Sequence, residues 1–169
     1  MNLIGTDISD GSRASLRVAI PNTYTHLKII YQGRSNSPSY VDVAAGLQFN
    51  DDTGTTYWWQ QARFNSNSAQ ITRGGGGTEV RIGISTVPAG LAEAGSSGTG
   101  EILVPNYKST HFYKHANVLA SEHWAYPEGN DAVMVNCGIR RDIGEIVSVS
   151  LVLDEGVWTQ YSQIWAYGI

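Results

Sequence analysis

The triplet Asp52-Thr53-Gly54 is the part of this sequence that most suggests catalysis, because Asp-Thr-Gly is the active-site triplet of aspartic proteases. In those sites two carboxylates from paired loops share one proton. Here Asn50 and Asp51 precede Asp52, and a second adjacent carboxylate would compete for that proton. Asp and Asn side chains accept backbone N–H bonds in turns, and glycine supplies positive φ. We therefore predict a structural turn, a hairpin between two strands, formed by Asn50, Asp51, Asp52 and Gly54.

Metal-binding patterns are weak in this chain. The Asn50–Asp52 loop offers oxygen ligands for Ca²⁺ but lacks the alternating acids, central glycine and distant glutamate of an EF-hand loop. His111, His115 and His123 would line one face of a helix, where the HxxxH spacing can bind zinc. On a strand His111 and His115 would lie about 13 Å apart, too far to share an ion. We expect no metal and no cofactor, with the histidines at an edge or interface.

The other candidates for chemistry have simpler explanations. Cys137 ends an apolar stretch, Val133-Met-Val-Asn-Cys, so we expect a buried core residue rather than a nucleophile. The run Gly74–Gly77 is no phosphate-binding loop, since no Lys-Ser or Lys-Thr follows it and no βα unit surrounds it. No nucleophile–base pair or acid pair remains. The sequence favours binding or structure over catalysis, and we expect no enzymatic activity.

Aromatic residues with a polar edge are the best candidates for binding. The chain has 5 Trp and 9 Tyr but only 3 Phe, and such side chains suit surfaces that are half buried and half wet. Trp58 and Trp59 point to opposite faces of a strand, so at most one of them can join a given surface. The candidate residues for an interface or a glycan-binding surface are Tyr57, Trp58, Trp59, Trp124 and Trp165.

Composition excludes several classes of partner. The 169 residues carry a net charge of −4, and the basic residues are scattered, whereas nucleic-acid-binding proteins usually cluster them. A single cysteine excludes an intramolecular disulfide. We expect no signal peptide, because the N-terminus lacks a basic start and an apolar run, and no membrane insertion. Charged residues are 15% of the chain, against about 25% in typical domains. The low charge and the high Tyr and Trp content indicate a protein that functions within a larger assembly.

Strands must position these residues, since alternation of β-branched and aromatic residues dominates the chain. The predicted strands are 15–20, 26–32, 40–50, 56–63, 79–86, 101–104, 132–138, 145–153 and 161–167, with 111–119 ambiguous but extended. Residues 65–77 are expected to be loop, and 90–94 a single helical turn. We predict an all-β, antiparallel, jelly-roll-like β-sandwich of about nine strands with little helix. It would form a single domain over 15–169, preceded by a polar arm over 1–14.

Four segments, in order, resemble a family of bacteriophage virion proteins. They are Ile20–Ile29 (IPNTYTHLKI), Phe49–Tyr57 (FNDDTGTTY), Val104–Tyr107 (VPNY) and the ending Ser162–Ile169 (SQIWAYGI). The combination carries the resemblance, because none of the segments is a catalytic signature. Asp51 replaces the glycine usual in that family, and Tyr161-Ser162 replaces a frequent Gly-Ser before the last strand.

The resemblance implies a non-enzymatic virion surface protein, of a kind known on tail fibres, tail tips and capsid surfaces. Only about a dozen residues precede the first predicted strand, too few for a fibre shaft, so we expect a capsid decoration or cement protein that stabilises the shell through many-copy contacts. The alternative is a tail component that binds a host receptor or glycan. The expected partners are the major capsid protein or tail proteins, and further copies of the chain, with a trimer as one arrangement. Its expected location is the virion, assembled in the host bacterial cytoplasm.

Overall fold

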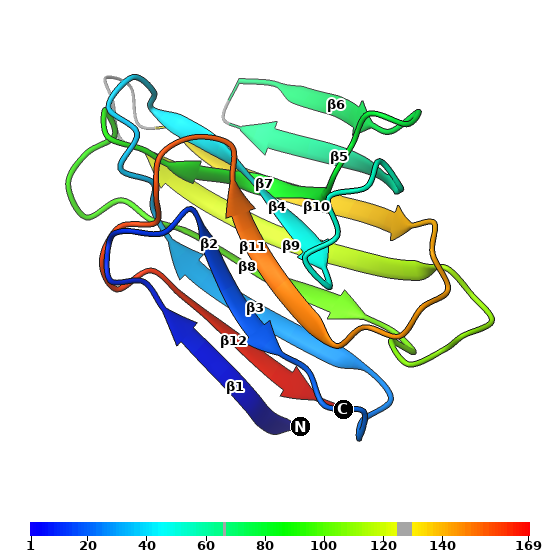
Figure 1. Ribbon diagram of the computed structural model, residues 1–169. Helices are drawn as coiled ribbons and strands as arrows, with labels where there is room; N and C mark the ends of the chain where they lie inside the picture. Colours follow the sequence, from blue (N-terminus) through cyan, green and yellow to red (C-terminus); the bar gives the residue numbers. More distant parts are fainter. Residues whose placement is uncertain (66, 125–129) are drawn as a thin grey trace.

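The computed structural model describes residues 1–65, 67–124 and 130–169, and these residues form strands joined by turns and loops (Figure 1). The strands are β1 (Asn2–Ile8), β2 (Ser15–Ala19), β3 (Leu27–Gly33), β4 (Asp42–Phe49), β5 (Tyr57–Asn65), β6 (Ala69–Gly74), β7 (Ile82–Pro88), β8 (Gly98–Val104), β9 (Lys114–Trp124), β10 (Asn130–Arg140), β11 (Ser148–Leu153) and β12 (Gln163–Gly168). The described residues contain no helix, so none that could cross a membrane, and the helical turn expected at 90–94 is wrong.

The strands form two antiparallel sheets, which confirms the predicted sandwich. One sheet has eight strands in the order β1-β12-β3-β8-β9-β10-β5-β6, and the other has four in the order β2-β11-β4-β7. If the β9–β10 hairpin and the β1–β12 edge are set aside, eight strands remain in two four-stranded layers, and the chain changes layer after every strand except β5. The layers are β2-β11-β4-β7 and β3-β8-β5-β6, the double-sheet arrangement of a jelly roll. The β9–β10 hairpin enters this arrangement between β8 and β5 and widens one layer.

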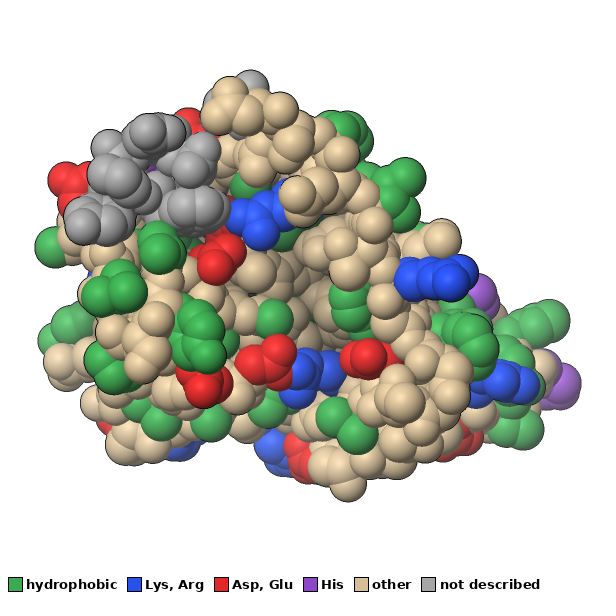
Figure 2. Space-filling view, turned by 90° about the horizontal axis from the view of Figure 1, so that it is seen from above, with side chains coloured by type: hydrophobic (Ala, Val, Ile, Leu, Met, Phe, Trp, Pro, Cys, Tyr) green, Lys and Arg blue, Asp and Glu red, His purple; other side chains and the backbone are tan. Residues whose placement is uncertain are grey.

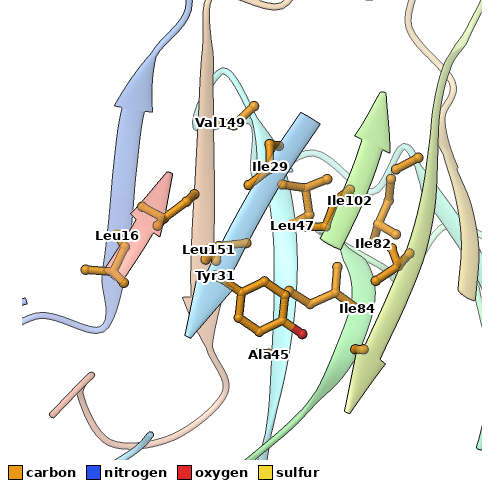
Figure 3. Close-up of a cluster of buried hydrophobic side chains, with 14 of the residues drawn as sticks. Leu16, Ile29, Tyr31, Ala45, Leu47, Ile82, Ile84, Ile102, Val149 and Leu151 are labelled. Carbon is orange, nitrogen blue, oxygen red and sulfur yellow. The ribbon is translucent and has the colours of Figure 1, made fainter. Parts of the chain in front are cut away.

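The core lies between the two layers, and Figure 3 shows aliphatic side chains of both sheets meeting there around Tyr31. Alternate residues of each strand point into this space, as the period of two requires. Leu16, Ile29, Leu47, Ile82 and Leu151 are all fully buried. Burying one such side chain contributes about 1.5–3 kcal/mol, so the contact between the layers supplies much of the stability of the fold.

Two segments that were not expected to be strands extend the large sheet at its edges. Most of the predicted N-terminal arm is β1, which pairs with β12 from Asn2 to Ile8. Residues 65–77 were expected to be loop, but β6 lies within them and pairs with β5. The side chains of β6 are almost all exposed, so its sequence lacks the alternation that marks a half-buried strand. Backbone pairing with β5, rather than side-chain burial, holds β6 in place.

The two layers differ in width, so part of the large sheet extends past the small one. In Figure 1, β5 and β6 stand beyond the four-stranded sheet. Near this end, Arg63 of β5 forms ion pairs with Glu122 (2.8 Å) and Asp42 (3.4 Å). From the same end, Figure 2 shows acidic and basic side chains beside one another near a hollow in the surface. Paired charges, rather than more apolar packing, fill the edge of the sandwich here.

Candidate functional site

One face of the large sheet, here called the outer face, is turned away from the small sheet. Directly opposed residues of neighbouring strands form rows across it, with about 4.8 Å between strands. One row crosses the sheet from β12 to β6 and contains mostly apolar residues: Trp165, Ile30, Glu101, Leu119, Val135, Ala62 and Ile71. This row is therefore apolar where an antiparallel sheet facing water is usually polar.

Exposure makes this row a candidate contact surface. Leu119 is 56% exposed, Val135 51% and Ile71 82%. The carboxylate in the row, Glu101, is paired with Lys28 at 2.9 Å, so its charge is neutralised within the face. A shallow hollow of about 620 Å³ lies over these residues. Contiguous exposed apolar side chains of this kind mark interaction surfaces in soluble proteins.

Trp58 lies on the outer face at the end where β5 enters the sheet. Its side chain is 41% exposed, and the Arg141 guanidinium carbon lies 5.8 Å from its ring centroid, within the range of a cation–π contact. Gly75 lies against the indole, because a Cβ on Gly75 would come within 2.7 Å of it. The ring is thus held in place by neighbours while a large part of it faces solvent.

A hollow of about 840 Å³ opens beside Trp58. Ile139 and His115 stand in the same row as Trp58, and Gln60 and Arg73 stand opposite each other in the next row. Ligand sites of proteins commonly have about 300–1,000 Å³ and combine an apolar wall with a few polar groups. This hollow has both features, with the indole as its wall and amide, imidazole and guanidinium groups around it.

The glycine run frames the hollow in a conformation that other residues adopt poorly. Gly75, Gly76 and Gly77 have φ values of 146°, 78° and 87°. Gly76 and Gly77 also line a second, smaller hollow with Trp58, Tyr113 and Arg141. Glycine is needed at Gly75 for a further reason, since a side chain there would displace the indole. The run is therefore a shaped wall of the Trp58 hollow and was not recognised as such in the sequence.

Tyr57 and Trp59, the neighbours of Trp58, lie on the other side of β5, although Trp59 also reaches the lining of the Trp58 hollow. Tyr57 is fully buried, its hydroxyl contacts the backbone N–H and C=O of Phe49, and burial raises its pKa to about 12. Trp59 is half-buried on the inner side and donates its indole N–H to Glu79 Oε2 at 3.3 Å. The predicted opposite orientation of Trp58 and Trp59 is confirmed. Tyr57 is a core residue, so its proposed place at an interface or glycan site is wrong.

The other two candidate tryptophans are separate from the Trp58 hollow. Trp165 lies partly buried on the outer face at the β12 end of the apolar row. Trp124 ends β9, where its backbone pairs with Asn130, and its side chain lies outside the described residues. Trp165 thus belongs to the candidate contact surface, at the opposite side of the sheet from Trp58.

The turn that contains the Asp-Thr-Gly triplet is present. Asn50 and Asp51 have φ values of 58° and 54°, and the Asp52 N–H donates to Phe49 C=O at 3.0 Å, which defines a two-residue turn of the I′ type. The turn joins β4 of the small sheet to β5 of the large sheet, so the expected hairpin is wrong. Gly54 does not carry the positive φ. It donates its N–H to Asp52 Oδ1 at 2.8 Å.

Asp52 has the environment of a structural carboxylate. Its Oδ2 accepts a bond from Arg140 Nε at 2.9 Å, and Arg140 also pairs with Asp142. Burial acts to raise the pKa of Asp52, but the bonds from the Gly54 N–H and from Arg140 outweigh burial and lower that pKa. A protease dyad instead needs two carboxylates that share a proton. Arg140 pairs with both Asp52 and Asp142, so each carboxylate is stabilised in its ionised form and the two have no need to share a proton.

The oxygens considered for calcium are already bonded within the protein. Asp51 accepts bonds from Arg17 Nε and Ser150 Oγ, both at 2.8 Å. Asn50 Oδ1 accepts the N–H groups of Val147 at 2.7 Å and Ser148 at 3.2 Å. Within the described ranges, no group of three or more His, Cys, Asp or Glu residues is placed to hold a metal ion. The polar side chains of this turn fasten β4 to β11 and β2.

The cysteine and two histidines lie on the outer face. Cys137 is exposed there, so its predicted burial is wrong, because the alternation of β10 places Asn136 inward in its stead. His115 and His123 are both exposed on β9, and His123 is hydrogen-bonded to Asp131. His111 precedes the strand. The helical face that would have gathered the three histidines therefore does not form.

Two arginines beside Trp58 were missed in the sequence: Arg73, which lines the Trp58 hollow, and Arg141, which lines the smaller hollow next to it. Arg73 immediately precedes the glycine run, and Arg141 is part of the sole adjacent pair of basic residues. Both positions were visible, but their proximity to Trp58 follows from pairing between β5 and β6 and between β5 and β10. Comparison with known proteins adds no further candidate, since no family model, no curated protein and no solved structure matches this chain.

Proposed function

We propose that this chain is a non-enzymatic surface protein of a bacteriophage virion, and that it attaches to other virion proteins through the outer face. The observation that carries the proposal is the apolar row from Trp165 to Ile71, exposed on an otherwise well-packed sandwich. A capsid decoration role is the form we favour, because weak contacts of one such face are multiplied over the many equivalent positions of a shell. The major capsid protein is then the main partner.

The size of the outer face suits such a contact. Eight strands span about 38 Å, and strands of this length extend about 20 Å, so the face covers roughly 760 Å². One partner in a standard protein–protein interface contributes about 800 Å². The face also mixes apolar residues with amides such as Asn117 and Gln60, as interfaces between stable proteins do. An additional copy of the chain could use part of the same face, which fits the proposed homo-oligomer.

The fold supports the proposal by analogy. Double-sheet jelly rolls occur in viral capsid proteins, and also in lectins and cupins, so the architecture alone does not select a function. The four segments that resemble phage virion proteins add to it, and one of them contains the Asn50–Asp51 turn. The usual glycine at position 51 of that family agrees with the φ of 54° at Asp51, where glycine is the least strained residue.

Immunogold labelling of intact phage particles with antibody to this chain tests the location. Label over the head supports a decoration protein, and label confined to the tail supports the second candidate below. For the decoration role, purified protein should rebind stripped, expanded capsids and raise their melting temperature. Absence of label from the particles would contradict the proposal as a whole.

Substitutions on the outer face test the mode of attachment. Leu119→Lys and Val135→Lys place a charge in the apolar row and should each weaken particle binding at least about tenfold, since burying an unpaired charge is costly. Val147→Lys is the matched control, because Val147 is 55% exposed and lies before β11, away from the outer face. Equal binding of all three variants would exclude the apolar row as the attachment surface.

A tail component that binds host glycan is the second candidate, and the Trp58 hollow is the observation that favours it. An exposed indole beside polar groups can hold the apolar face of a sugar ring while those groups bond its hydroxyls. Sugar-dependent quenching of tryptophan fluorescence, absent in Trp58→Ala, is the expected result. No response to a panel of bacterial surface glycans would count against this candidate and leave the attachment proposal untouched.

A further inference from the structure

The arginines of this protein divide into two groups by their partners. Arg13, Arg17, Arg63, Arg81 and Arg140 each form an ion pair with Asp or Glu. Arg34 donates to the backbone C=O groups of Ala89, Ala92 and Glu93. The guanidinium groups of Arg73 and Arg141 have neither an acid nor a carbonyl partner among the residues that the structure describes. Both of these arginines lie at the hollows that Trp58 shares.

Most other basic residues have an acidic or carbonyl partner, and Lys108, away from the hollow, is the exception among the described residues. The chain has more acidic than basic residues, with 15 Asp and Glu against 11 Lys and Arg, so acidic partners are plentiful. Lys28 also has one, in Glu101. The carboxylate that does line the Trp58 hollow, Glu79, bonds the indole N–H of Trp59. Glu79 keeps its negative charge in that bond but pairs with neither guanidinium, so both arginines near Trp58 lack an anionic partner among the described residues.

We propose that the Trp58 hollow binds a saccharide that carries a carboxylate, such as a uronic or sialic acid residue. The inference rests on the glycan-binding candidate, which it makes specific. Because the hollow lies on the outer face beside the apolar row, a saccharide and a partner that covers the whole face would compete for it. Each part of the ligand has a counterpart in the site. The indole of Trp58 offers a flat apolar surface for the C–H face of a pyranose ring, and a guanidinium offers the planar fork that matches a carboxylate.

The register of the strands sets how these groups act together. Arg73 is opposite Gln60, which is two residues from Trp58 on the same face of β5. Arg73 and Trp58 are therefore diagonal neighbours, with about 7–8 Å between their Cα atoms, a separation that one sugar residue can bridge. Arg141 lies over the indole itself, so it adds positive charge beside the stacked ring. Gly75 has no side chain, which lets the indole lie directly against the backbone that follows β6.

A nucleic acid is the other class of ligand that combines flat rings with anionic groups, and the molecule disfavours it. Single-strand-binding surfaces use several aromatic platforms along a basic groove. Here one exposed indole has two arginines beside it, and the whole chain carries a net charge of −4, which repels a polyanion. A single carboxylate in a hollow of about 840 Å³ matches this amount of positive charge better.

Matched acidic and neutral probes test the proposal on the purified full chain. Trigalacturonate is compared with its methyl ester, and sialyllactose with lactose, so that each pair differs in the carboxylate charge or in the acidic residue. Binding is measured by titration of tryptophan fluorescence and by calorimetry. At least one acidic probe should bind about tenfold more tightly than its neutral partner, because a charge-assisted bidentate bond is lost in the latter. That advantage should shrink as salt is raised.

Variants assign the effect to the site. Arg73→Gln should remove most of the difference between acidic and neutral probes, and Trp58→Ala should abolish binding of both. Lys108→Gln is the matched control, because it removes the same charge outside the hollow and should change neither affinity. Thermal unfolding of each variant checks that the fold is intact.

The outcomes separate this inference from the candidate on which it rests. Equal binding of acidic and neutral probes would overturn the inference and leave glycan binding in place. No binding of any probe would overturn both. Tighter binding of oligo(dT) than of the acidic saccharides would overturn the inference in favour of nucleic acid. Loss of the acidic preference in Arg73→Gln but not in Lys108→Gln is the result that supports it.

Discussion

Arg140 and Arg141 are adjacent in the chain, yet they belong to two regions with opposite properties. Arg140 is 6% exposed, lies on the inner face of the large sheet and forms ion pairs with Asp52 and Asp142. Arg141 is exposed, has no acid partner in the described part of the chain, and contacts the Trp58 ring. Tyr57 and Trp58 differ in the same way, one fully buried in the core and the other open to solvent.

The difference shows how polar and aromatic groups serve structure in one region and binding in the other. In the Asp52 region, donors and acceptors are largely matched within the protein, so the network fastens a turn between the two sheets. Around Trp58, the guanidinium groups of Arg73 and Arg141 have no acid or carbonyl partner among the described residues. Groups that the fold does not satisfy are available to a ligand, and removing them should cost little stability.

The largest expected difference is between Tyr57→Ala and Trp58→Ala. Truncating a fully buried aromatic side chain leaves a cavity, so Tyr57→Ala should lower the free energy of unfolding by about 3–5 kcal/mol. Trp58→Ala should lower it by less, about 2 kcal/mol, because Trp58 is 41% exposed and leaves no enclosed cavity. Urea unfolding followed by circular dichroism measures both. Similar losses in the two variants would mean that Trp58 is part of the core.

The two arginines should differ next. Arg140→Leu leaves two carboxylates without their cation, and we expect a loss of about 2–3 kcal/mol in unfolding free energy, below the value for a fully buried pair because both acids are partly exposed. Arg141→Leu should stay within about 0.5 kcal/mol of the parent protein. Urea midpoints at unchanged m-values give the comparison. A large loss in Arg141→Leu would contradict the assignment of this residue to binding.

Alanine at Gly75 and at Gly76 should separate strain from displacement of the indole. Both residues have positive φ, so each substitution should cost about 1 kcal/mol of stability. A Cβ at Gly75 would come within 2.7 Å of Trp58, whereas one at Gly76 meets nothing within 4 Å. Only Gly75→Ala should therefore change the emission of Trp58 and weaken saccharide binding. Identical spectra of the two variants would show that Gly75 does not position the ring.

The smallest effect concerns acid stability. Because the pKa of Asp52 is lowered in the folded protein, its contribution is complete above its ordinary value of 3.8 and is lost as the pH falls through the lower folded value. The stability difference between the parent protein and Asp52→Asn should therefore be constant from pH 7 to about pH 4 and shrink below that. Unfolding free energies at several pH values measure it. A difference that grows on acidification would contradict a carboxylate stabilised in its ionised form.

Much of the fold was predictable because half-buried strands carry a period of two. The strand at 40–50 alternates Val43, Ala45, Leu47 and Phe49, and the structure buries all four in β4. The turn at Asn50–Asp51 was predictable from side chains that favour turns. β1 and β6 were missed because edge strands with exposed side chains show no such pattern. The hairpin at that turn was wrong because local sequence does not reveal to which sheet a strand belongs.

The candidate site was only half predictable for a related reason. Trp58 could be named from its type, and its orientation opposite to Trp59 from strand geometry. Arg73 and Arg141 could not be assigned to it, because they reach Trp58 from β6 and from the end of β10. Cys137 was misplaced because its stretch, Val133 to Cys137, has apolar residues on both faces, so hydrophobicity did not show which face is buried.

The sequence by itself determined that the chain is all-β, that alternate residues of each strand face opposite sides, and which residues form turns. It also contained no nucleophile–base pair or acid pair with catalytic spacing. These follow from local rules, since alternation and turn chemistry act between residues close in the chain. Only the tertiary structure decided that one sheet has twice as many strands as the other and that an apolar row lies on its open face. It also decided that two arginines without an acid partner in the described residues lie near Trp58. Those properties depend on pairing between strands far apart in sequence, which local patterns do not encode.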